Sequence, residues 1–190
     1  MERVLIQDKK FEKENLTVNK LQIADYEYCV FTNGDLSNSD LSQRVFLDCE
    51  FNSCNLSTAK LIKTGLKNVK FKGCKLLGLH FENCDQFLFE VDFDNCILNL
   101  SSFYKLKLKK TKFKHSNLSE VDFTEADLTC SLFDNCDLAG AKFEKTILEK
   151  ADLRTSRNYS IDPELNKIKK ARFSIHGITG LLDKYDIEIE

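Results

Sequence analysis

The stretch that decides the fold is residues 121–155, which read VDFTE ADLTC SLFDN CDLAG AKFEK TILEK ADLRT. The third residue of each group of five is Leu or Phe, and the first is small or slim. A period of five fits neither the 3.6-residue repeat of an α-helix nor the two-residue alternation of a flat strand. The pattern instead indicates a solenoid whose backbone turns a corner every five residues.

The same period extends over most of the 190 residues. The large apolar position is occupied by Phe11, Leu16, Leu21, Tyr26, Phe31, Leu36, Leu41, Phe46, Phe51, Leu56, Leu61, Leu66, Phe71, Leu76 and Phe81, and after a slip of two residues it resumes at Leu88 and Phe93 and continues to Leu153. One large and one small side chain per unit, both pointing to a narrow axis, fill an interior at high density. The other three residues face water, which explains how a chain with 31% charged residues keeps a continuous core.

Units such as Ala126–Cys130 and Ala151–Thr155 resemble the A-(D/N)-L-x-x motif of pentapeptide-repeat proteins. The resemblance covers residues 11–156. It implies an all-β fold, a right-handed quadrilateral β-helix of about seven coils with four units per coil, in which residue n lies above residue n+20. Columns of like residues, such as Phe93, Phe113 and Phe133, agree with this stacking. We expect one β-helix over residues 1–157 and a C-terminal cap or dimerisation segment over residues 158–190.

Eight cysteines raise the alternatives of disulfides, a metal site or simple packing. Seven of them occupy the small inward position, and Cys130 alone falls outside it. Because the chain has no C-x-x-C pair and no Cys/His cluster with zinc spacing, we interpret the seven as small buried hydrophobic residues. We therefore expect reduced thiols, no metal and no cofactor.

Catalytic signatures are missing from the sequence. The three histidines, His80, His115 and His176, are scattered, and the glycines form no phosphate-binding loop. We expect no enzymatic activity. The first ten residues contain no apolar run typical of a secretory signal, and no stretch is long and apolar enough to span a membrane. These features predict a cytoplasmic protein without a membrane partner.

Charged residues alternate in blocks along the chain: acidic over residues 82–94, lysine-rich over 105–114, and acidic again over 116–138. One interpretation makes the lysine block a nucleic-acid patch and the acids a mimic of DNA phosphate. The other uses the n+20 stacking, which forms ladders of opposite charge worth roughly 0.2–1 kcal/mol per exposed pair. We favour the ladders and expect no direct nucleic-acid binding. The predicted ladders are Asp94, Lys114, Asp134 and Arg154 in one column, and Lys105, Glu125 and Lys145 in another.

Two further segments interrupt or follow the repeat. The phase slip at residues 82–92 predicts either a bulge or a projecting contact made by Phe87 and Phe89. After Arg157, Ser174 is a candidate cap for an α-helix that covers the open end of the solenoid. Gly177 and Gly180 weaken that helix, so it needs packing to form. Its expected apolar face consists of Ile175, Ile178, Leu181, Leu182 and Tyr185.

The tail, with Ile161–Ile168 followed by Gly180–Ile187, resembles the C-terminal tail of microcin immunity proteins and of Qnr-type quinolone resistance proteins. This resemblance implies a homodimer formed through the C-terminal segment, with DNA gyrase or topoisomerase IV as a partner that is bound by DNA mimicry. Two function classes follow. One is a topoisomerase-binding protector, and the other is a structural adaptor that binds an unrelated protein. For the first class, the predicted contact residues are Glu120, Asp122, Glu125, Asp127 and Asp134.

Overall fold

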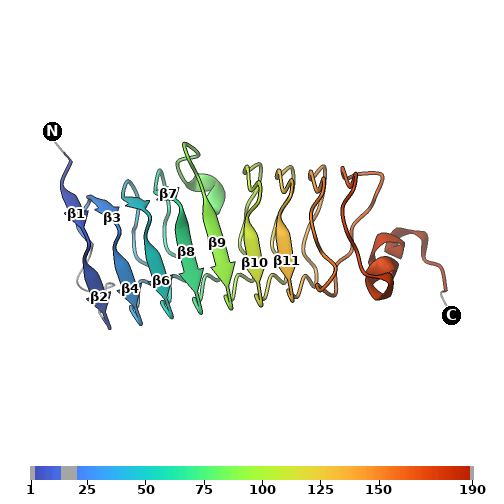
Figure 1. The fold of residues 1–190 in the computed structure, drawn as a ribbon, viewed down its shortest axis with the longest axis horizontal. Helices are drawn as coiled ribbons and strands as arrows, with labels where there is room; N and C mark the ends of the chain where they lie inside the picture. Colours follow the sequence, from blue (N-terminus) through green and yellow to red (C-terminus); the bar gives the residue numbers. More distant parts are fainter. Residues whose placement is uncertain (1–2, 14–20, 189–190) are drawn as a thin grey trace.

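The computed structural model describes residues 3–13 and 21–188 of the chain, so the predicted central residue Leu16 lies outside the described residues. The described chain winds into one elongated rod with its two ends at opposite extremes (Figure 1). All of its strand pairs are parallel, as a solenoid requires. The predicted all-β solenoid is therefore confirmed.

The strands are three or four residues long and lie in two parallel sheets. The short sheet contains β1 (Leu5–Gln7), β3 (Asp25–Glu27), β5 (Val45–Leu47) and β7 (Gly65–Lys67). The long sheet contains β2 (Lys10–Glu12), β4 (Val30–Thr32), β6 (Glu50–Asn52), β8 (Val69–Lys72), β9 (Val91–Asp94), β10 (Lys112–Lys114) and β11 (Leu132–Asp134). Isolated parallel bridges continue the same ladders where no strand is assigned.

The register of these ladders confirms the twenty-residue coil. Phe31 pairs with Phe51, and Phe113 pairs with Phe133. The pairing continues beyond the end of the sequence repeat at Arg157, because Asp152 still forms a bridge with Arg172. The backbone of the coil therefore extends further along the chain than the repeat of residue types does.

Nearly every five-residue unit ends in a residue with positive φ, for example Lys110 (64°), His115 (49°) and Asn135 (52°). Such a backbone costs an L-residue roughly 1–2 kcal/mol. The N–H of the corner residue donates to a carbonyl of the next coil, as Lys110 does to Thr129 at 3.0 Å. This hydrogen bond offsets the cost and fixes the corner, so each side of the coil is five residues long.

The interior is built from stacked columns, as the sequence predicts. Seven rings of the long-sheet side form one stack, with neighbouring centroids 4.6–5.5 Å apart: Phe11, Phe31, Phe51, Phe71, Phe93, Phe113 and Phe133. Rings from other sides meet this stack edge-on, as Phe123 meets Phe133 at 5.9 Å. Offset and edge-on ring pairs are the favourable arrangements for aromatic side chains. The seven predicted inward cysteines are buried and Cys130 is exposed, which confirms that prediction.

The phase slip differs from the prediction in one position. Asp85 pairs with Gly65 in the twenty-residue register, whereas Val91 pairs with Val69 in a register of 22, so the two extra residues lie within residues 86–90, called here the slip loop. The expectation that Leu88 resumes the inward series is wrong, because its side chain is 65% exposed and Phe89 packs partly against the core instead. The loop follows the short 3-10 helix η1 (Phe81–Asn83) and projects beside the start of β9 (Figure 1).

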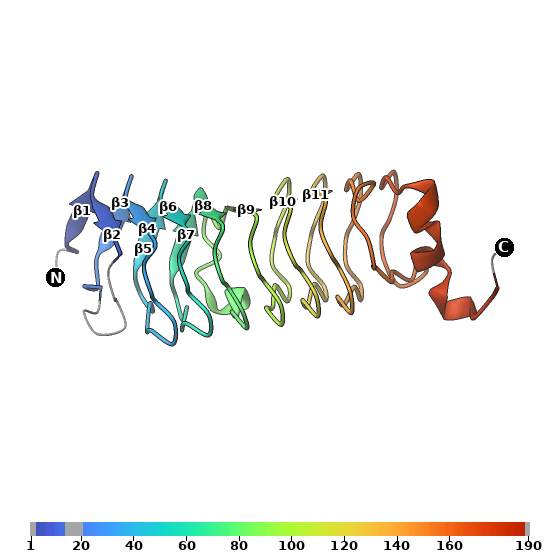
Figure 2. The same ribbon diagram turned by 90° about the horizontal axis from the view of Figure 1, so that it is seen from below.

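The C-terminal segment covers the end of the rod, as expected, but it is wound differently (Figure 2). The predicted α-helix is replaced by two 3-10 helices, η2 (Ile175–Leu181) and η3 (Asp183–Tyr185). Ser174 caps η2 by accepting a hydrogen bond from the Gly177 N–H at 3.0 Å. A Cβ on Gly177 or Gly180 would collide with Tyr159, so both glycines must face that residue. A 3-10 helix aligns residues three apart, which brings both glycines to one side.

Candidate protein-binding surfaces

The predicted acidic contact residues lie on different sides of the rod. Asp122 belongs to the ladder Ser102–Asp122–Lys142, and Asp127 belongs to the next ladder, Lys107–Asp127–Ile147. Asp134 lies in β11 of the long sheet. Glu120 and Glu125 occupy exposed corners with positive φ. The structure therefore brings Glu120, Asp122 and Glu125 to one side, residues 120–125, and places Asp127 and Asp134 on two others.

The three aspartates already have partners within the rod. The Asp122 carboxylate accepts the Thr124 N–H at 2.8 Å, and the Asp127 carboxylate accepts the Thr129 N–H at 3.1 Å. Partial burial acts to raise the pKa of Asp127, but hydrogen bonds from Thr129 and Lys109 outweigh it and hold that pKa below the usual value. These aspartates shape the turns. The exposed charge of the region comes from Glu120 and Glu125.

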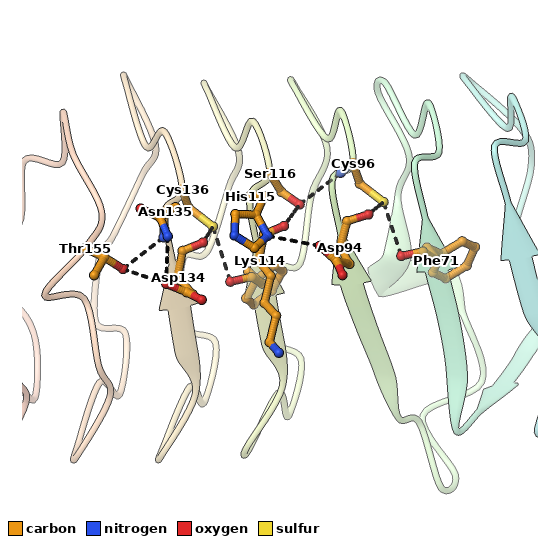
Figure 3. A network of polar contacts seen from close by, with 11 residues as sticks. Phe71, Asp94, Cys96, Lys114, His115, Ser116, Asp134, Asn135, Cys136 and Thr155 are labelled. Atoms are coloured by element: carbon orange, nitrogen blue, oxygen red, sulfur yellow. Dashed lines mark hydrogen bonds and ion pairs between the residues drawn. The ribbon is translucent and has the colours of Figure 1, made fainter.

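Asp134 belongs to a polar network along the long sheet (Figure 3). Its carboxylate accepts hydrogen bonds from Thr155 Oγ1 at 3.0 Å and from the Asn135 side-chain amide at 3.0 Å. One coil earlier, His115 Nδ1 lies 3.2 Å from Asp94. The thiols of Cys96 and Cys136 donate inward to backbone carbonyls beneath this surface. The network links successive coils and engages one carboxylate oxygen of Asp134, Oδ1.

The lysine coil, residues 105–114, lies next to these acids. The predicted pair of Lys105 and Glu125 forms at 3.6 Å between Nζ and Oε2. In the other predicted column, which contains Asp94, Lys114, Asp134 and Arg154, the backbone register is as expected but the side chains form different ion pairs. Asp94 pairs with His115, and Arg154 pairs with Asp152 of its own unit at 2.9 Å. Exposed side chains this long reach several neighbours, so register alone does not select the ion pair.

The predicted dimerisation residues do not form a single exposed face. In the 3-10 helix, Ile175 and Ile178 lie one turn apart and are 81% and 48% exposed, whereas Leu181 packs partly against the core. Tyr185 belongs to the separate helix η3, and its hydroxyl donates to Glu164 at 3.0 Å. Lys184 bridges Asp162 and Glu164 at 2.8 and 2.7 Å, which holds the segment on the rod.

Two family models match the chain, "Pentapeptide repeats (8 copies)" over residues 49–85 and "Pentapeptide repeat region" over residues 86–158. Together they span more than half of the chain and meet at the slip loop. The chain belongs to the pentapeptide-repeat family.

Two solved structures show what this pentapeptide-repeat protein is similar to. QnrB1, a plasmid-mediated fluoroquinolone resistance protein, is 17% identical, with a TM-score of 0.54 over 96% of this chain and 100% of QnrB1. HetL, a pentapeptide-repeat protein involved in heterocyst differentiation regulation from the cyanobacterium Nostoc sp. strain PCC 7120, is 16% identical, with a TM-score of 0.40 over 91% of this chain and 87% of HetL. No curated protein sequence matches the chain. At these identities the likeness to QnrB1 concerns the fold.

The described residues of this pentapeptide-repeat protein contain no group of three or more His, Cys, Asp or Glu side chains arranged to hold a metal ion. No helix within the same residues has the length and hydrophobicity needed to cross a bilayer.

Sequence reasoning missed some exposed apolar side chains. Leu88 is exposed beside Phe87 on the slip loop, and Leu77, Ile97 and Leu100 are exposed on the opposite side of the rod. Their signal was present in the sequence, because Leu77, Ile97 and Leu100 stand at outward positions of the five-residue unit. These side chains add apolar surface to an otherwise polar rod.

Proposed function

We propose that this pentapeptide-repeat protein is a non-enzymatic rod that binds another protein along its side, and that a type II DNA topoisomerase, DNA gyrase or topoisomerase IV, is its partner. The observation that carries the proposal is how the fold divides its side chains between the core and the surface. Most of the Leu, Phe and Cys residues pack in a stacked core, and three residues of every five lie outward on straight ladders. Such a surface suits recognition of an extended partner.

The choice of a topoisomerase is supported by the resemblance of the tail to Qnr-type proteins and by the fold that the chain has in common with QnrB1, a fluoroquinolone resistance protein. The contact surface that we propose is narrower than the acidic run of the sequence. It consists of the side at residues 120–125, where Glu120 and Glu125 are exposed at the two corners. Carboxylates at fixed spacing on a rigid side are the groups that would stand in for DNA phosphates.

The test is a supercoiling assay with purified gyrase and ciprofloxacin, with and without the chain. We expect the chain to restore supercoiling, and we expect Glu120→Lys combined with Glu125→Lys to abolish the rescue. The matched control is Asp8→Lys with Glu12→Lys, which changes the net charge equally at the far end of the rod. Both variants should melt within a few degrees of the wild type, because the four side chains are exposed. Absence of rescue at micromolar wild-type protein would exclude gyrase protection.

A second candidate function is a structural adaptor for an unrelated protein. The observation that favours it is the charge of the chain, which is −2 overall and includes six lysines within residues 105–114. Such a surface differs from the uniformly acidic one that DNA mimicry requires. Under this alternative, gyrase neither binds the chain in a sedimentation assay nor responds to it in the supercoiling assay.

We also propose that two copies associate through the C-terminal segment, with Ile175 and Ile178 as the apolar contacts. Two observations support this proposal. Both side chains are exposed, and the ion pairs of Lys184 with Asp162 and Glu164 hold the segment on each rod.

A further inference from the structure

The ladder of the short-sheet side is broken where the slip loop lies. On this side Gly65 pairs with Asp85, and further along Lys107 pairs with Asp127, which pairs with Ile147. In the intact part, the Asp127 N–H donates to the Leu106 carbonyl at 2.8 Å and the Lys110 N–H donates to the Thr129 carbonyl at 3.0 Å.

The corresponding bonds on the slip-loop side of the lysine coil do not form. Within residues 3–13 and 21–188, no hydrogen bond reaches the Lys107 N–H, the Lys107 carbonyl or the Lys109 carbonyl. The lysine coil therefore presents a short open strand edge toward the slip loop. Unpaired backbone groups of this kind accept an added extended chain.

A hollow of about 520 Å³ lies next to this edge. It is lined by Phe89, Glu90, Val91, Asp92, Lys107, Lys109, Lys110, Thr111 and Lys112. Two of its lysines are neutralised, since Lys109 pairs with Asp127 at 3.2 Å and Lys112 pairs with Asp92 at 3.7 Å. Lys107 and Lys110 form no ion pair within 4 Å among the described residues, and both are exposed.

The slip loop, whose Phe89 lines the hollow, also carries exposed apolar side chains. Phe87 and Leu88 of the slip loop are 66% and 65% exposed, and the Lys67 ammonium lies 5.1 Å from the centre of the Phe87 ring. An interface with an aromatic anchor and surrounding charge is typical of protein recognition.

We propose that the space between the slip loop and the lysine coil is a docking site for an extended acidic segment of a partner protein that carries an apolar side chain. The segment pairs with the free backbone groups of Lys107 and Lys109, places carboxylates at Lys107 and Lys110, and packs its apolar side chain on Phe87 and Leu88. The inference rests on the proposed function as a protein-binding rod and names the chemistry of the partner's contact.

The same observations disfavour a nucleic acid as the occupant. Glu90 and Asp92 line the hollow and Asp127 pairs with its Lys109, so a continuous polyanion would meet three carboxylates. A peptide with charges on alternate residues places its own carboxylates away from them, because neighbouring side chains of a strand point to opposite faces. Only a peptide backbone can continue the broken ladder.

The test is fluorescence anisotropy with the labelled peptide Glu-Val-Glu-Phe-Glu-Val-Glu added to the full chain. We expect Lys107→Glu with Lys110→Glu to weaken binding about tenfold or more, because both unpaired lysines face the segment. The matched control is Lys167→Glu with Lys170→Glu, which occupies the same two places in the coil on the same side of the rod and should change binding less than about twofold. Replacing Phe87 and Leu88 by Ser should also weaken binding, with the melting temperature unchanged.

Three outcomes overturn the proposal: no binding of the peptide, equal loss in both lysine variants, or binding of oligo-dT that is as tight as that of the acidic peptide. The supercoiling assay separates this inference from the proposed function. Rescue of gyrase without peptide binding refutes the docking site and leaves the topoisomerase function standing. Peptide binding with the expected variant effects but without rescue supports the site and refutes the topoisomerase as partner.

Discussion

At the scale of the residue, the small inward position is filled in most units by Cys, Ser, Thr, Ala or Val, with Arg44, Leu79 and Leu106 among the exceptions, and a thiol there still has a polar role. The Cys136 Sγ lies 3.3 Å from the Phe113 carbonyl, and the Cys49 Sγ lies 3.4 Å from the Tyr26 carbonyl. Both partners lie 23 residues earlier in the chain, so each thiol connects one coil to the preceding one. Cysteine fills the narrow slot and satisfies a backbone acceptor at the same time.

These thiols predict a loss of stability at alkaline pH. Burial raises the pKa of Cys49 and of Cys136 from 9.0 to about 12. In the unfolded chain the thiols ionise from about pH 9, whereas in the folded chain they stay neutral, so their contribution to the free energy of unfolding is constant below pH 9 and falls as the pH rises toward 12. By pH 10 each thiol should remove about 1 kcal/mol.

The measurement is urea unfolding followed by circular dichroism at pH 8 and pH 10. Changing Cys49 and Cys136 to Ala, a residue that the same slot holds at Ala126 and Ala151, should reduce the difference between the two pH values. An unchanged difference in the double variant would contradict the assignment.

At the scale of the element, individual strands of three or four residues have little stability of their own, and the columns between them hold the coil together. Phe113 is fully buried and contacts four rings: Phe93 and Phe133 in its own stack, and Phe103 and Phe123 edge-on. The slip loop is the opposite case, since Phe87 and Leu88 contribute little to the core.

Phe113→Ala should therefore lower the free energy of unfolding by about 3–5 kcal/mol, because it removes a ring and leaves a cavity in a close-packed stack. The same change at Phe87 should alter stability by no more than about 0.5 kcal/mol. Thermal unfolding of the two variants beside the wild type measures the contrast. Equal losses would show that the slip loop is part of the core.

The features of the fold that the sequence predicted correctly are those that depend on its five-residue repeat. The inward residues follow from the spacing, and the twenty-residue columns follow from the resemblance to pentapeptide-repeat proteins; the structure confirms both. The position of the slip loop does not follow, because Phe87, Leu88 and Phe89 are all large and apolar, and only the pairing of Val69 with Val91 decides which one turns inward.

The candidate sites were less predictable than the fold. The acids at residues 120–134 were grouped by their proximity in sequence, although a corner every five residues separates Asp122, Asp127 and Asp134 into different ladders. The expected stacking of residue n on residue n+20, with a corner every five residues, already predicted this separation. The open strand edge at Lys107 had no sequence signal, since it depends on hydrogen bonds that fail to form.

At the scale of the whole molecule, the two ends of the rod differ. β1 and β2 are the outermost strands of their sheets at the N-terminal end, whereas η2 and η3 cover the C-terminal end (Figure 2). The C-terminal end also presents Ile175, which is 81% exposed. The asymmetry favours association through the covered end.

Light scattering should show a dimer for the wild type and a monomer for Ile175→Asp with Ile178→Asp. The physical reason is that two buried charges in an apolar contact lack partners. Because both side chains are exposed in the single chain, the variant should keep the melting behaviour of a folded coil. A monomeric wild type would refute the dimer.

On the C-terminal side of the slip loop the register is constant at twenty residues, so each coil lengthens the rod by the same amount. Duplicating residues 111–130 would add one coil, which lengthens the rod by about 4.8 Å and keeps like residues stacked in each column. Any two features on one side of this rod, such as the hollow at Lys107 and the cap at its end, can thus be moved apart in equal steps without altering either one.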